Sequence, residues 1–149
     1  MLVSTCFLSF QILNTKVIFN AQVTDGGSNY EVTGDLTFDR VDINIGGAFD
    51  GSSGIFKVPI SGTYKMTFSG QSAVNRIDFT WIRVYKNGSI MFYIYDANRA
   101  ENAYENNVSY TWIMTLVQGD ELKLSSVNYL HATNDRPLTF TGELIHIEN

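Results

Sequence analysis

The side chains best suited to binding a metal ion gather in one polar segment, residues 96–107. A hard cation such as calcium takes about six to eight oxygen ligands from carboxylates, amides, backbone carbonyls and water, and a loop supplies these more readily than a strand. The sequence therefore predicts a long loop here, which is either a calcium site or an ordinary polar surface loop. Its oxygen-bearing side chains include Asp96, Asn98, Glu101, Glu105, Asn106 and Asn107.

Two histidines, His131 and His146, are the candidates for a histidine base in catalysis. Such catalysis needs a nucleophile within hydrogen-bond reach of the base and a third group that orients the base. Neither histidine lies in a motif such as Gly-x-Ser-x-Gly or His-Glu-x-x-His, and no carboxylate pair is marked for glycoside hydrolysis. We interpret both as solvated or capped side chains, His131 in a polar loop at 130–136 and His146 at the end of the last strand. No catalytic residue is predicted.

The composition describes one globular domain with little surface charge. The 149 residues suffice for a sizeable core, and 44% of them are apolar while 17% are charged. The formal net charge of -5, without a basic cluster, disfavours a nucleic-acid partner. Aromatic residues make up 13% of the chain, so we expect part of the weakly charged surface to be an interface.

Residues 1–15 are an N-terminal apolar segment that precedes the predicted domain, residues 16–149. The apolar run 1–13 is too short to span a membrane. It resembles the apolar part of a signal peptide, although it lacks a basic start and a clear small-x-small cleavage site. We therefore expect a signal-peptide remnant or an extension, and an extracellular, secreted protein. Cys6 has no intrachain partner, so it either belongs to the targeting segment or links subunits.

Residues 38–68 organise the predicted fold. Aromatic residues recur there at intervals too long for a helix and are separated by glycine-rich turns, which predicts three successive strands. Val41, Ile43 and Ile45 alternate with polar residues, as in a half-buried strand. Phe38 has the wrong parity for that buried face, so a bulge or bend is expected near Asp39.

The rest of the chain also reads as short strands without a convincing helix. Asn87-Gly88 is a strong hairpin signal, because both residues tolerate positive φ. The strand at 90–95 is apolar on both faces, so we expect one face to meet the core and the other a partner chain. These patterns predict a β-sandwich, with a jelly roll among the two-sheet solutions. The strands are predicted at 16–23, 78–85, 90–95, 108–117, 121–128 and 138–147.

The spacing within 38–68 resembles the fingerprint of the complement C1q-like globular head family. That fingerprint runs Phe, five residues, Asn or Asp, four residues, aromatic, six residues, Phe, five residues, Gly-x-Tyr-x-Phe-x-aromatic. Met66 is the one departure, and methionine fills a volume similar to that of the usual Phe. Residues 16–22, 116–122 and 139–144 resemble three further family elements, so the resemblance covers roughly 16–147. The matching framework residues are Phe38, Asn44, Phe49, Phe56, Gly62, Tyr64, Phe68, Gly119, Asp120, Phe140 and Gly142.

The resemblance implies an all-β fold, a ten-strand two-sheet jelly-roll β-sandwich related to tumour necrosis factor, assembled as a homotrimer about a threefold axis. It also implies a non-enzymatic secreted module that binds extracellular proteins or glycans multivalently. In calcium-binding members of the family the ion lies near the threefold axis, held by the loop that corresponds to 96–107. Asp96, Glu105 and Asn106 are the implied ligands here, and Ser109 or Asn106 stands where those members usually have a second aspartate. No other cofactor is expected.

Three other functions stay open. A jelly-roll lectin would bind carbohydrate through an exposed tryptophan or tyrosine. An intracellular scaffold would carry the same head inside the cell, and a jelly-roll hydrolase would hold two carboxylates or an oriented histidine in a pocket.

Two further groups of residues are singled out by the sequence. Asn87 and Asn107 each begin an Asn-x-Ser sequon, a glycan acceptor in a secreted eukaryotic chain. Large aromatic side chains outside the fingerprint are candidate interface anchors, with core packing as the alternative role for each. These aromatic residues are Trp81, Tyr93, Tyr95, Tyr104, Tyr110, Trp112 and Tyr129.

Overall fold

The computed structural model describes residues 15–24, 30–72, 80–96 and 107–148. Within these ranges the chain forms eleven strands, and no helix there is long and apolar enough to cross a membrane. The strands are β1 (Ile18–Val23), β2 (Tyr30–Asp35), β3 (Arg40–Ile45), β4 (Phe49–Asp50), β5 (Ile55–Lys57), β6 (Gly62–Ser72), β7 (Thr80–Lys86), β8 (Ser89–Asp96), β9 (Asn107–Leu116), β10 (Glu121–Ala132) and β11 (Leu138–Ile147).

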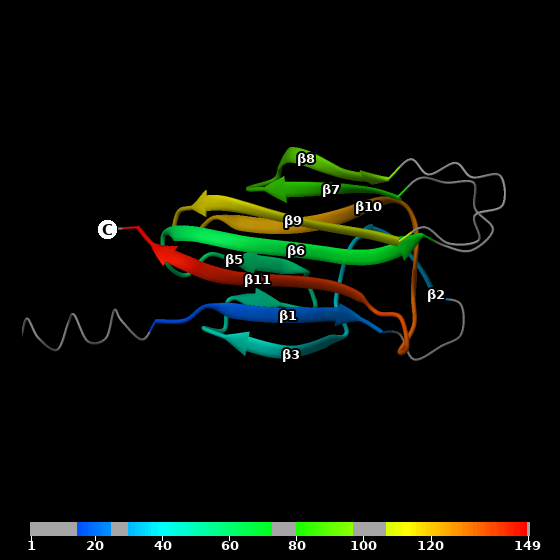
Figure 1. Ribbon diagram of the computed structural model, residues 1–149, viewed down its shortest axis with the longest axis horizontal. Helices are drawn as coiled ribbons and strands as arrows, with labels where there is room; N and C mark the ends of the chain where they lie inside the picture. The colour runs from blue at the N-terminus through cyan, green and yellow to red at the C-terminus, as the bar shows by residue number, and fades with distance from the viewer. Residues whose placement is uncertain (1–14, 25–29, 73–79, 97–106, 149) are drawn as a thin grey trace, which may run out of the picture.

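The strands form two antiparallel layers packed face to face (Figure 1). The first layer has the order β3-β1-β11-β6-β9 and lies nearest the viewer in Figure 1. The second layer is built on β10, which pairs with β7 along one edge and with β5 and β2 along the other, while β8 and β4 flank β7 and β5. Two residue pairs, Ser72–Leu130 and Gln71–His131, connect β6 to β10 and so join the layers. The predicted β-sandwich is present.

Phenylalanine rings hold the two layers together. Phe19 of β1 stacks on Phe49 with ring centroids 4.5 Å apart and meets Phe140 edge to face at 5.1 Å. Phe38 and Phe56 extend the cluster, at 5.5 Å from Phe49 and 5.0 Å from Phe19. All five side chains are buried. Because they come from β1, β4, β5, β11 and the segment before β3, their packing brings together strands that are distant in sequence.

Two smaller framework residues shape the space around these rings. A Cβ atom on Gly142 would lie 2.4 Å from a Phe19 ring carbon, so only glycine lets β11 pass this close to the cluster. The Asn44 side chain donates a hydrogen bond to the Phe49 carbonyl at 2.9 Å and accepts one from the Phe49 N–H at 3.2 Å. These bonds close the turn that brings Phe49 back over the core.

The isoleucines of β3 do not lie on the predicted buried face. Adjacent residues of β1 pair with Val41 and Ile43, so Asp42 is an extra residue in β3. One extra residue reverses the side-chain parity of a strand. Val41 packs against the core, whereas Ile43 and Ile45 are 42% and 48% exposed. The prediction of a bend near Asp39 is confirmed.

Two other parts of the chain also differ from expectation. β2 was not predicted, because its sequence Tyr-Glu-Val-Thr-Gly-Asp has a weak apolar pattern and becomes a strand by pairing with β10. β10 runs on to Ala132 instead of ending near residue 128, since β2 provides a partner for that length. His131 therefore lies in a strand and not in a polar loop at 130–136.

The predicted hairpin between β7 and β8 is confirmed. Asn87 and Gly88 have φ values of 50° and 77°, and the two strands pair antiparallel. Ile82, Val84 and Ile94 of this hairpin are buried in the core. The opposite face, which bears large aromatic side chains, is exposed in the single chain.

Replacing Gly142 by alanine tests the packing of the core. The added methyl group would overlap the Phe19 ring, which is packed against Phe49 and Phe140, so we expect the free energy of unfolding to fall by about 1–3 kcal/mol. Gln118→Ala, in the exposed turn between β9 and β10, is the control and should change it by less than about 0.5 kcal/mol. Urea denaturation at one protein concentration measures both. Equal stability of G142A and the unmodified chain would contradict the packing argument.

Candidate functional site

The outward face of the first layer carries little charge. The edge strand β3 carries an exposed Arg40–Asp42 ion pair. The other four strands, β1, β6, β9 and β11, contain one lysine, Lys65, one glutamate, Glu143, and no arginine or aspartate. These two side chains form an ion pair with each other. The cross-strand register aligns the outward residues in rows. We call two of these rows the threonine–isoleucine face: Ile45, Ile18, Glu143, Lys65 and Ile113 in one, and Ile43, Asn20, Thr141, Thr67 and Thr111 in the other.

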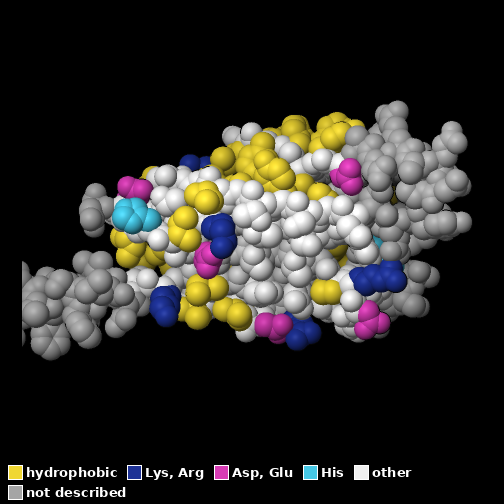
Figure 2. Space-filling view, in the orientation of Figure 1, with side chains coloured by type: hydrophobic (Ala, Val, Ile, Leu, Met, Phe, Trp, Pro, Cys, Tyr) yellow, Lys and Arg dark blue, Asp and Glu magenta, His cyan; other side chains and the backbone are white. Residues whose placement is uncertain are grey.

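Isoleucines of this face stand in solvent in the single chain. Ile113 is 62% exposed, the highest value among the large hydrophobic residues of the described chain. Figure 2 shows apolar side chains on either side of a lysine–glutamate pair and a broad uncharged area beside them. Thr67 and Thr111 share a hydrogen bond between their hydroxyl groups at 2.9 Å. Exposed isoleucines among polar side chains that already pair with one another are typical of a surface that another protein covers.

Aromatic side chains line the edge of the sandwich between β8 and β9. The Phe92 ring lies 5.4 Å from Trp112 and 5.8 Å from Tyr110, measured between centroids. Among the described residues, β8 pairs only with β7 and β9 only with β6, so this edge is open. The buried Trp112 indole N–H has no hydrogen-bond partner among those residues. We call Phe92, Tyr110 and Trp112 the aromatic rim, a second apolar surface beside the threonine–isoleucine face.

The outward face of the second layer carries an aromatic patch. Trp81 of β7 meets Tyr93 and Tyr95 of β8 edge to face, with centroids 5.6 and 5.8 Å apart. All three residues are exposed, as an interface anchor must be in the unbound chain. The structure separates the other candidate anchors into the exposed Tyr110 and Tyr129, the buried Trp112, and Tyr104, which lies outside the described residues.

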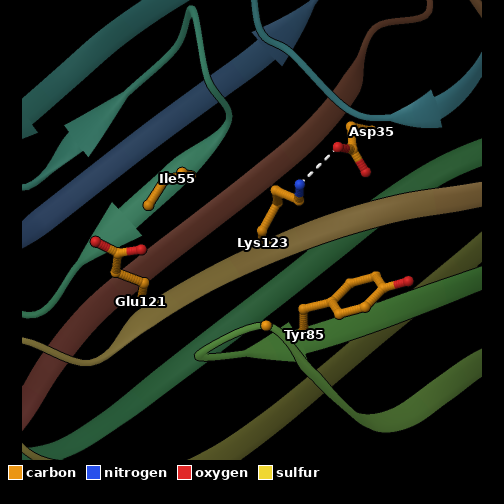
Figure 3. A pocket seen from close by; sticks show the side chains of 6 residues that line it. Asp35, Ile55, Tyr85, Glu121 and Lys123 are labelled. Carbon is orange, nitrogen blue, oxygen red and sulfur yellow. Dashed lines mark hydrogen bonds and ion pairs between the residues drawn. The ribbon is translucent and has the colours of Figure 1, made fainter.

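A cleft of about 390 Å³ opens over β10 on the same layer (Figure 3). Tyr85 of β7 is the direct cross-strand neighbour of Lys123, and Glu121 precedes Lys123 on β10. Ile55 lies in β5, and Asp35 ends β2. Lys123 Nζ donates a hydrogen bond to Asp35 Oδ2 at 2.6 Å, and this bond lowers the pKa of the Asp35 carboxyl below its ordinary value. Sequence analysis missed this cleft, because it contains no motif and Asp35 and Lys123 are 88 positions apart.

Asp120, a framework residue, ties two turns together. Its carboxylate accepts hydrogen bonds from the Val117 N–H at 2.9 Å and the Asn87 amide at 2.8 Å, and Lys86 Nζ lies 3.2 Å away. Burial raises the pKa of the Asp120 carboxyl, but these donors outweigh it, and the pKa falls below its ordinary value. Asn87 Oδ1 in turn accepts the Glu121 N–H at 2.8 Å. The first sequon asparagine thus has a structural role as well.

The predicted calcium ligands fall mostly outside the described residues. Asp96 ends β8 with a half-buried side chain, whereas Glu105 and Asn106 lie in the segment 97–106 that the structure does not describe. Elsewhere in the described ranges, no group of three or more histidine, cysteine, aspartate or glutamate side chains is placed to hold a metal ion. The calcium site stays a prediction. Asn107 of the second sequon begins β9 and is exposed.

The two histidines lie in different surroundings. His131 is buried in β10, and its Nδ1 hydrogen-bonds the Gln71 side-chain amide at 3.1 Å. Its partner is therefore an amide and not a nucleophile, and the interpretation of His131 as a loop residue is wrong. His146 is exposed near the end of β11, opposite Thr63 of β6.

Comparisons with known proteins agree with the fingerprint. The model of the C1q domain family matches residues 14–145. The mouse protein named complement C1q tumor necrosis factor-related protein 3 is 31% identical over 113 residues, which are 74% of this chain and 44% of that protein. The chain belongs to the C1q domain family. It spans less than half the length of this relative.

Solved structures share the fold. The globular domain of zebrafish complement 1qA protein matches with a TM-score of 0.69 at 17% identity, covering 90% of this chain and 100% of that one. Murine APRIL at pH 5.0 matches with a TM-score of 0.65 at 11% identity, covering 88% and 100%. The predicted all-β jelly-roll sandwich is confirmed. The described residues form eleven strands, one more than the expected ten, and the shortest of them, β4, has two residues.

Asp120→Asn tests the turn network. Since folding lowers the pKa of this carboxyl, its ionised form stabilises the fold above the ordinary pKa, and the contribution is lost as the pH falls through the lowered value. We expect D120N to reduce the free energy of unfolding by about 1–3 kcal/mol at neutral pH and to weaken its decline below about pH 4. Urea denaturation across a pH series measures both effects, with the exposed Asp135→Asn as the control. Identical pH profiles for D120N and the unmodified chain would count against this role.

Removal of metal tests the calcium prediction. If Asp96 and the following loop bind calcium, chelation with EDTA lowers Tm, because a ligand at about 100 times its Kd stabilises the native state by about 2.7 kcal/mol. Asp96→Asn should remove the calcium-dependent part of Tm, and Asp42→Asn should preserve it. Scanning calorimetry with EDTA and with excess calcium measures the difference. The same Tm in both solutions would exclude a structural calcium site.

Proposed function

We propose that this chain is the head of a non-enzymatic extracellular recognition protein that assembles as a homotrimer. The threonine–isoleucine face carries the proposal, because it combines exposed isoleucines with an ion pair that is already satisfied within the chain. Full burial of one such isoleucine contributes about 1.5–3 kcal/mol. Membership of the C1q domain family supports the same reading.

The aromatic rim supplies a second surface for the assembly. Phe92 and Tyr110 lie at the open edge between β8 and β9, and Ile113 projects from the same strand as Tyr110 on the outward face. When one patch of a copy packs on a different patch of the next copy, the contact is head to tail and can close into a ring. The rim of one copy on the threonine–isoleucine face of the next would bury both apolar surfaces in a ring of three.

In this proposal the second layer binds the ligand. The aromatic patch and the cleft lie on the layer opposite the threonine–isoleucine face, so assembly through that face leaves them in solvent. Tryptophan and tyrosine are enriched among the side chains that dominate binding free energy at interfaces. Three heads that present the same weak site bind a multivalent extracellular ligand with avidity.

A hydrolase is the second candidate, since the cleft contains two carboxylates, Asp35 and Glu121. Glycoside hydrolysis requires one carboxyl group to be protonated when it meets the leaving group. Lys123 stabilises the ionised form of Asp35, which opposes that role. Of the two histidines, His131 is buried against an amide, and His146 lies on β11 in the other layer. These contacts favour binding over catalysis.

Secretion is supported by the apolar run at 1–13 and by the family. The intracellular scaffold is the alternative. Expression of the chain with residues 1–15 in cultured animal cells distinguishes the two locations. We expect the protein in the medium, and retention in the cytosol would contradict the extracellular part of the proposal.

Light scattering of the purified chain tests the assembly. We expect three times the 16.7 kDa mass of one chain across micromolar concentrations. Ile113→Glu should yield monomers, because burial of an unpaired carboxylate is strongly unfavourable. Ile90→Glu is the matched control at an exposed isoleucine of the second layer and should remain trimeric. A monomer mass for the unmodified chain at every concentration would contradict the proposal.

A further inference from the structure

We propose that the cleft over β10 binds one ring of a neutral saccharide. The inference rests on the proposed recognition function and names the ligand class of the second layer. It starts from the chemical groups that the fold brings around the cleft: two carboxylates, one ammonium group, one phenol ring and one aliphatic side chain. The lining residues are Asp35, Ile55, Tyr85, Gly88, Glu121 and Lys123.

Backbone pairing sets the positions of these groups. Directly opposite residues of neighbouring strands project from the same face of a sheet, so Tyr85 and Lys123 project together from the outward face. Glu121 is two residues before Lys123 on β10 and therefore shares that face. Figure 3 shows Ile55 and Glu121 toward one end of the cleft and Asp35 with Lys123 toward the other. The polar groups thus surround an opening that Tyr85 flanks.

The charges around the cleft are balanced within the chain. Lys123 Nζ lies 2.6 Å from an Asp35 oxygen, and Lys57 Nζ lies 3.8 Å from a Glu121 oxygen. Lys57 lies outside the lining, with a largely exposed side chain. Counted together with Lys57, the two carboxylates are matched by two ammonium groups, so neither sign of charge dominates around the cleft. A phosphate or an acidic peptide would meet both carboxylates, while a basic side chain would compete with two lysines already in place.

Balanced charge leaves hydrogen-bonding capacity. A carboxylate offers about four acceptor positions and an ammonium group three donors, and one ion pair uses only a part of these. Each hydroxyl group of a sugar is both a donor and an acceptor, so neighbouring hydroxyls can meet Glu121 or Asp35 and Lys123 together. The Tyr85 ring and Ile55 offer apolar surface to the C–H face of the same ring. An aliphatic chain is a poorer ligand, because most of the side chains that line the cleft are polar.

The size of the cleft agrees with a small ligand. At about 390 Å³ it lies near the lower end of the range of roughly 300–1,000 Å³ for small-molecule sites. One saccharide ring matches that space, with further rings of a glycan left outside. Binding to a single head would then be weak, and a trimer would strengthen it toward a glycan-bearing surface.

Ligand-observed NMR of the full chain tests the inference. The probes are the methyl glycosides of glucose, galactose, mannose and N-acetylglucosamine, with glucose 6-phosphate and N-acetyl-lysine amide as the charged comparisons. We expect at least one neutral glycoside to bind more tightly than either charged probe. Tyr85→Ala and Glu121→Gln should each weaken that binding about tenfold or more. Tyr129→Ala, an exposed tyrosine of β10 outside the cleft, is the matched control and should bind as before.

Each result decides the inference separately from the proposed assembly. No binding of any neutral glycoside at tens of millimolar, or tighter binding of a charged probe, overturns it even if the chain is trimeric. Unchanged glycoside binding in both cleft variants also overturns it, because the sugar would then bind elsewhere. A variant with a lowered Tm is replaced by Tyr85→Leu, which keeps the apolar volume but removes the phenol ring. Specific binding by a monomeric chain would uphold the cleft and contradict the trimer.

Discussion

The packing of Phe19 against Phe49, Phe140 and Phe56 is the contact on which both layers depend. In the described chain, strand pairing joins the two layers at only two residue pairs, both between β6 and β10. The layers are therefore held face to face mainly by buried side chains, and the rings near Phe19 come from both of them. Gly142 is part of the same constraint, since a side chain there would occupy the space of the Phe19 ring.

Because the inward side chains hold the layers together, the side chains of the two outward faces can differ. The first layer presents threonines, isoleucines and the ion pairs Lys65–Glu143 and Arg40–Asp42, whereas the second presents an aromatic patch and a polar cleft. A single residue has a large effect on this pattern. The extra Asp42 in β3 turns Ile43 and Ile45 outward, so side chains that alternate like core residues become part of the exposed face.

Charge is handled in the same way on both faces. Lys65 and Glu143 pair on the first layer, and Asp35 and Lys123 pair on the second. Exposed pairs of this kind add little to stability. Each charge nevertheless has its counter-charge within the chain, so a partner that covers the pair does not have to supply one. The two faces therefore differ in their other side chains. The first layer has isoleucines suited to contact with a protein surface, and the second has a tyrosine and polar groups with hydrogen-bonding capacity left for a ligand with many hydroxyls.

The sequence by itself determined the β-sandwich, the β7–β8 hairpin and the family, because turn residues, alternating strands and aromatic spacing are local patterns that do not depend on which strands pair. Tertiary structure alone decided four further features: that Tyr30–Asp35 is a strand, that His131 is buried, that the isoleucines of β3 point outward, and that Asp35 meets Lys123. Each of these depends on which strand lies next to which and in what register. Such pairing joins residues far apart in the chain, and no local pattern records it.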